Sequence, residues 1–209
     1  MGALALVPTG SGVAVGVHCR GGRPHVLPDG FIERAVQIVV RDREVRVNFS
    51  VGLNPETMRE VLAAWQVDDS EELRFSSEDE LRKAFGQALK RRLLERAKLT
   101  VNGEPLEFDQ ATIDLAVRHP YDLTVQIVGQ LPADRSRVDL GWKSDSLTAW
   151  TGTARLACKA MGKAILIRSN VAPIVVRAKQ VELSELKPEA RSKACHIRAR
   201  LMVLNGDQR

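Results

Sequence analysis

"EVRVNFSVGL", residues 44–53, decides the fold class because its side chains alternate strictly. From Val45 to Leu53 every odd position is apolar, and the even positions between them are polar or glycine. A period of two is typical of a β-strand with one buried face and one wet face. Residues 31–40 place several apolar side chains and Arg34 on one face, and 41–43 are charged. The two stretches therefore predict an antiparallel hairpin with its turn at 41–43.

Two helices are predicted directly after this hairpin. Asn54 is a favoured N-cap residue, and Pro55 suits the first helical position. An apolar stripe follows at positions 58, 61, 62 and 65. Ser77 and Glu80 have the spacing of a capping box, and a second stripe runs through 81, 85, 88, 89 and 93. The sequence thus predicts a helical insertion over about 55–98.

The rest of the chain is dominated by short alternating segments. Asn102-Gly103 is a favoured two-residue turn and predicts a hairpin over 99–108. Further strands are predicted over 121–131, 137–142, 154–158, 164–168, 174–183 and 197–204. This pattern predicts an α+β fold of mostly antiparallel β-structure: an immunoglobulin-like β-sandwich with a two-helix insertion after the second strand. We expect residues 25–209 to form one such domain.

The first 24 residues differ from the remainder in composition. The apolar stretch "ALALVPTGSGVAVGV", residues 3–17, is interrupted by proline, glycine and serine, and no basic residue precedes it. A secretory signal has a basic start and an unbroken apolar centre. We interpret residues 1–24 as a flexible leader or a degenerate signal segment. No stretch is long and apolar enough to predict a membrane-spanning helix.

Positive charge is concentrated in the C-terminal third of the chain. Residues 151–209 contain twelve Lys or Arg and four Asp or Glu, whereas the formal net charge of the whole chain is +5. A solvated basic face is the commoner explanation, and a surface for nucleic acid or another polyanion is the alternative. The candidate anion-binding residues are Arg177, Lys179, Arg198 and Arg200. Aromatic residues make up only 4% of the chain, which disfavours base stacking.

The sequence contains no recognisable catalytic or metal-binding motif. We expect no catalytic residue, because no G-x-S-x-G, phosphate loop or H-E-x-x-H occurs. His25, just ahead of the first strand, is the candidate ligand if a divalent metal binds; otherwise no cofactor is expected. Cys158 and Cys195 are expected to be buried thiols, with a disulfide between them as the alternative in an oxidising compartment.

The order of these elements resembles that of one protein family. The segments "DGFIERAVQIVVRDREVRVNFSVGLN" and "FSSEDELRKAFGQALKRRLLERAKLTVNGEPLEF" carry the resemblance, which covers roughly residues 25–142. They are similar to the extracytoplasmic domain ahead of the membrane helices in HupE/UreJ-type nickel and cobalt permeases. The resemblance implies an exported, non-enzymatic binding or interaction domain, periplasmic or extracellular, with a protein or membrane-protein partner and a link to metal handling. The alternative hypothesis is a cytoplasmic basic module that binds nucleic acid or another polyanion through its C-terminal third.

Overall fold

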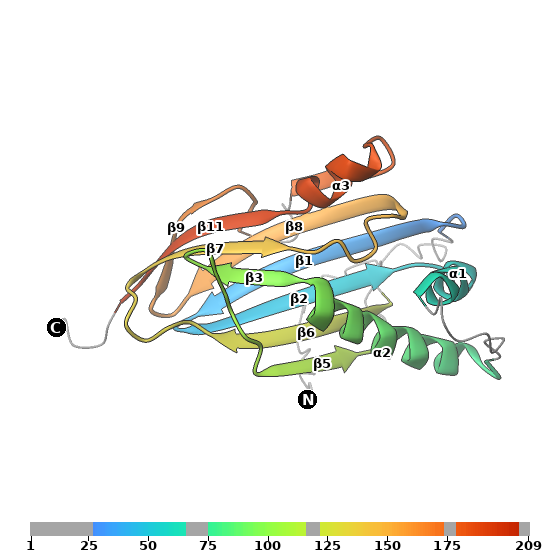
Figure 1. Cartoon of the computed structure of the whole chain (residues 1–209), viewed down its shortest axis with the longest axis horizontal. Coiled ribbons are helices and arrows are strands. Elements are labelled where there is room, and N and C mark those ends of the chain that lie inside the picture. Colours follow the sequence, from blue (N-terminus) through green and yellow to red (C-terminus); the bar gives the residue numbers. More distant parts are fainter. Residues whose placement is uncertain (1–26, 66–74, 116–121, 174–178, 205–209) are drawn as a thin grey trace, which may run out of the picture.

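The fold is α+β, with two sheets that are rich in antiparallel pairs and share one large core (Figure 1). The computed structural model describes residues 27–65, 75–115, 122–173 and 179–204. The six-stranded sheet has the order β10-β8-β1-β2-β6-β5 and the five-stranded sheet the order β4-β3-β7-β11-β9. The strands are β1 (Phe31–Arg41), β2 (Glu44–Gly52), β3 (Lys98–Val101), β4 (Glu104–Pro105), β5 (Gln110–Asp114), β6 (Leu123–Gln130), β7 (Arg137–Lys143), β8 (Thr151–Met161), β9 (Ala164–Ser169), β10 (Lys179–Glu182) and β11 (Ile197–Val203).

The predicted first hairpin is confirmed. Strands β1 and β2 pair antiparallel with Val36 opposite Phe49, and the apolar row of β2 is buried. Asp42 in the turn has φ 55, a left-handed conformation that aspartate tolerates better than most residues. The second predicted turn also forms, since Asn102 and Gly103 both have positive φ between β3 and β4. Local chemistry therefore sets both turns.

The predicted helical insertion consists of α1 (Pro55–Trp65) and α2 (Glu78–Arg96). Asn54 Oδ1 accepts the N–H of Thr57 at 2.7 Å, and Ser77 Oγ accepts the N–H of Glu80 at 3.2 Å. These contacts satisfy backbone donors at each helix start. Trp65 stacks on Phe85 across the two helices, with ring centroids 5.7 Å apart.

Three features of the fold were not predicted from the sequence. Strand β5 and the short helix α3 (Pro188–Ala194) lie in segments without a strong periodic pattern. Strands β1 and β8 pair in parallel over eleven residues, from Phe31 opposite Thr151 to Arg41 opposite Met161. Of the strand predicted over 174–183, β10 covers 179–182, and 174–178 lie outside the described residues.

Cys158 and Cys195 are buried and not bonded to each other, and burial raises the pKa of the Cys158 thiol to about 12. Within the described ranges, no helix is long and apolar enough to cross a membrane. The predicted leader, residues 1–24, lies outside those ranges.

Candidate functional site

The outer surface of the five-stranded sheet is strongly basic. Because side chains alternate along a strand, burying Ile197, Ala199 and Leu201 turns Arg198 and Arg200 outward. The same alternation exposes basic residues on the neighbouring strands. We call the resulting surface the basic face; its residues are Lys98, Arg137, Lys143, Arg168, Arg198 and Arg200. The five strands of this sheet contain two acidic residues, Asp139 on β7 and Glu104 on the edge strand β4.

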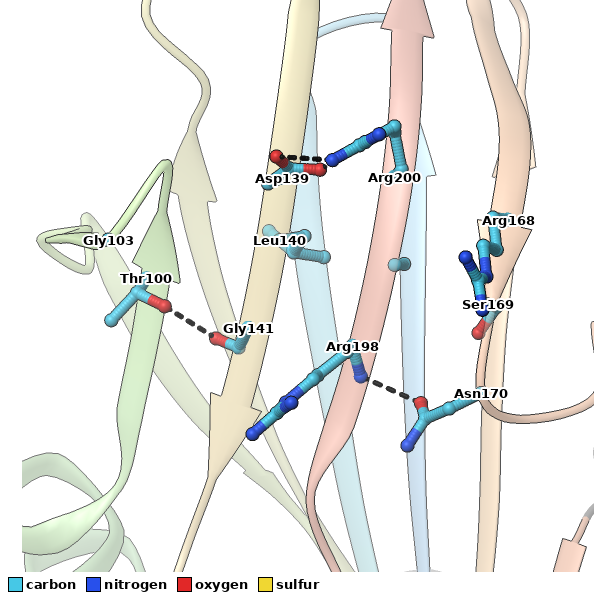
Figure 2. A pocket seen from close by; sticks show the side chains of 11 residues that line it. Thr100, Gly103, Asp139, Leu140, Gly141, Arg168, Ser169, Asn170, Arg198 and Arg200 are labelled. Atoms are coloured by element: carbon cyan, nitrogen blue, oxygen red, sulfur yellow. Dashed lines mark hydrogen bonds and ion pairs between the residues drawn. The ribbon is translucent and has the colours of Figure 1, made fainter.

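A shallow hollow of about 610 Å³ lies in the middle of this face. Figure 2 shows Arg198 extending from β11 toward Gly141 of β7, with Arg168 on the opposite side of β11. A Cβ atom at Gly141 would lie 2.7 Å from Thr100 Oγ1. The missing side chain at this position therefore keeps the floor of the hollow open beside the Arg198 guanidinium.

Asn170 fixes the position of Arg198 at the rim of the hollow. Its Oδ1 accepts the backbone N–H of Arg198 at 2.8 Å, and its Nδ2 donates to the carbonyl of His196 at 3.0 Å. The backbone N–H of Asn170 also donates to the carbonyl of Arg198 at 3.1 Å. The asparagine thus extends the β9–β11 ladder by one step after β9 has ended (Figure 2).

The three arginines of the hollow differ in how they are neutralised. Arg200 donates from Nε and Nη2 to the two carboxylate oxygens of Asp139, at 2.6 and 3.1 Å (Figure 2). This hydrogen-bonded contact holds the pKa of Asp139 below its usual value. Among the described residues, the guanidinium groups of Arg168 and Arg198 have no carboxylate partner. These two side chains are therefore available to an anion from outside.

His196 is a titratable residue two positions before Arg198, which lines the hollow. Its ring is half-buried, and its Nε2 has no hydrogen-bond partner among the residues that the structure describes. Burial lowers the pKa of His196, and the nearby charges of Lys143, Arg198 and Lys193 lower it further. The neutral ring is favoured because burial and the neighbouring positive charges both destabilise the protonated form.

The residues predicted from the sequence are only partly brought together. Arg198 and Arg200 share the basic face, whereas Lys179 belongs to β10, the edge strand of the other sheet. His25 and Arg177 lie outside the described residues. The sequence argument missed Arg168: the strand predicted over 164–168 contains it, but the irregular burial along β9 gives no alternation that would place this side chain on the basic face.

Arg34 is a buried charge with a structural role. Burial lowers its pKa to about 10, and its guanidinium donates to the carbonyls of Leu147 at 2.8 Å and Thr151 at 2.9 Å. Leu147 lies within the connection from β7 to β8, and Thr151 is the first residue of β8. Arg34 therefore ties this connection to β1 from inside the fold, away from the basic face.

Two further observations bear on identity and cofactors. No group of three or more His, Cys, Asp or Glu side chains gathers as a metal site in the described part of the chain. No protein-family model matches the sequence, and no curated protein matches it significantly. The resemblance to the extracytoplasmic permease domain thus stays a prediction from the sequence pattern.

Proposed function

We propose that this protein is a non-enzymatic binding domain that takes an anionic partner on the basic face. The observation that carries the proposal is the pair Arg168 and Arg198, two exposed guanidinium groups that border one open hollow without carboxylate partners among the described residues. A guanidinium presents several donors in a planar fork and stays charged at neutral pH, so phosphate, sulfate and carboxylate groups suit it.

The outward side chains favour recognition of charge over recognition of bases. Trp142 is the only aromatic residue in β3, β7, β9 and β11, and it is buried. Platforms that bind single-stranded nucleic acid usually stack bases on exposed aromatic rings. The face therefore suits a chain or layer of anionic groups more than a base sequence.

Two finer parts of the proposal rest on the sequence pattern. The family resemblance supports an exported domain with a protein or membrane partner, and we keep that location as part of the proposal. We also propose an immunoglobulin-like type for the two-sheet arrangement, supported by the antiparallel-rich sheets on a shared core. An immunoglobulin-like classification has to explain why β1 and β8 pair in parallel.

Calorimetric titration of the full chain with inorganic polyphosphate at several salt concentrations tests the proposal. Replacing Arg168 and Arg198 by Gln should weaken binding at least about tenfold and reduce the salt slope by about 2, one for each lost contact. The matched control, Arg59→Gln with Lys83→Gln, removes the same charge from exposed positions on α1 and α2. Equal losses in both variants, or no binding by the wild type at low salt, would reject a site on the basic face.

A further inference from the structure

One end of the basic face carries an exposed apolar patch. Ile165, Ile167 and Leu204 are 42%, 52% and 48% exposed, and they are three of the four large hydrophobic side chains with such exposure in the described residues. Ile165 lies opposite the half-buried Met202 on β11. We call the side chains of Ile165, Ile167, Met202 and Leu204 the apolar patch.

A register shift in the β9–β11 pair creates part of this patch. Arg200 lies opposite Arg168, and the next residue, Leu201, lies opposite Leu166. Ile167 is thus an extra residue, and both it and Arg168 are exposed. Bulges of this kind redirect side chains at sheet edges. Here the bulge sets an aliphatic side chain directly beside an arginine on the outer surface.

Basic side chains border the patch on two sides. Arg137, Arg200, Ile167 and Met202 line one hollow of about 500 Å³. A second hollow, of about 610 Å³, has Leu204 in its wall together with Arg41, Arg43 and Lys163.

The acidic residues near these hollows are engaged in contacts within the protein. Asp139 binds Arg200, and Glu44 pairs with Arg46 at 2.6 Å. Asp42 Oδ1 accepts the backbone N–H of Lys163 at 2.7 Å. The rim of the apolar patch therefore offers mainly positive charge to an approaching partner.

We infer that this end of the basic face docks on a membrane surface that contains anionic phospholipid. Large exposed apolar side chains in a polar rim mark contact surfaces. Aliphatic side chains that enter the headgroup layer, together with basic residues that meet anionic lipid, are the two components of peripheral membrane binding. The hollow that Arg137 lines together with Ile167 and Met202 offers both components to one amphipathic ligand, an anionic head attached to an alkyl chain.

The inference rests on the proposed function and names its partner. An acidic protein would match the charge, but it would leave the aliphatic side chains without a matching apolar surface unless it supplied one. A lipid layer supplies both as a mixture of phosphate groups and acyl chains. Each basic residue held near an anionic membrane strengthens binding by roughly fivefold, so the basic side chains of this rim add to the contribution of the aliphatic side chains.

Vesicle flotation of the full chain tests the inference. We expect binding to phosphatidylcholine vesicles that contain phosphatidylglycerol, and little binding to phosphatidylcholine alone. Ile165→Ser with Ile167→Ser should reduce the partition coefficient at least about tenfold, because two aliphatic side chains no longer enter the layer. Leu94→Ser is the matched control: this residue is the fourth exposed large hydrophobic, 41% exposed on α2.

The outcomes separate this inference from the proposed function. Polyphosphate binding without vesicle binding would overturn membrane docking and leave the anion site standing. Loss of both would overturn both. Vesicle binding that Leu94→Ser weakens as much as the isoleucine variant would place the contact elsewhere and overturn the inference. Tighter binding to poly-glutamate than to the anionic vesicles, weakened by the same isoleucine variant, would assign the patch to an acidic protein and also overturn it.

Discussion

Replacing Gly152 by Ala should strongly destabilise the fold, because this residue sits where β8 pairs in parallel with β1. Gly152 lies opposite Ile32 and has φ 121, a conformation that residues with a side chain rarely adopt. A Cβ atom there would lie 2.1 Å from the carbonyl oxygen of Ile32. Strain of about 1–3 kcal/mol and a similar cost for displacing a buried strand give an expected loss of about 2–6 kcal/mol.

The matched variant is Gly103→Ala in the turn between β3 and β4. Gly103 also has a positive φ, 91, but a Cβ atom there would meet nothing within 4 Å. Its expected cost is therefore the conformational strain alone, about 1–2 kcal/mol. Urea unfolding followed by tryptophan fluorescence, to which the buried Trp142 contributes, gives both values. A loss for Gly152→Ala that is no larger than the loss for Gly103→Ala would refute the close β1–β8 contact.

Four further outcomes are expected. Phe49→Asp should abolish cooperative thermal unfolding, because it places a charge in the buried row of β2; a soluble protein with a near-wild-type melt would contradict this. Arg198→Glu with Arg200→Glu should leave the melt almost unchanged, since both side chains are exposed, whereas aggregation would mean that this face is covered. Arg200→Gln should raise the pKa of Asp139 toward its ordinary value in an NMR titration. The wild-type pKa is lowered by the Arg200 contact, so the small stabilisation from this pair is present at neutral pH and is lost as pH falls through the folded-state pKa. Polyphosphate should raise the pKa of His196, because a bound anion offsets the surrounding positive charge; an unchanged ring titration at saturation would place the anion elsewhere.

Sequence patterns predicted those elements whose burial is decided locally. The alternation around Phe49 and the capping residues Asn54 and Ser77 act over a few residues, and each corresponds to an observed strand or helix start. Strand β5 lacks this signal, because none of its residues is fully buried and it lies at a sheet edge. Helix α3 has only seven residues, and Lys187 at its N-cap makes no side-chain capping bond. Tertiary contacts, which a local pattern does not encode, hold both elements in place.

The candidate site shows the same division between local and long-range information. Alternation along β11 is enough to predict that Arg198 and Arg200 share a wet face. It does not reveal which strands lie beside β11, and grouping Lys179 with these arginines assumed a neighbour that belongs to the other sheet. Arg168 enters the hollow only because β9 pairs with β11 and shifts register at Ile167.

Strand neighbours therefore decide the chemistry of the basic face more than the number of basic residues does. Asp139 of β7 lies opposite Arg200 and occupies its guanidinium, so this arginine is the least available to a ligand. Arg198, two residues earlier, lies opposite Gly141, which supplies neither a carboxylate nor a side chain to fill the space. Two residues along β11 thus separate an arginine that is paired within the protein from one that faces an open hollow, and the second arrangement is the one that we propose for an external anion.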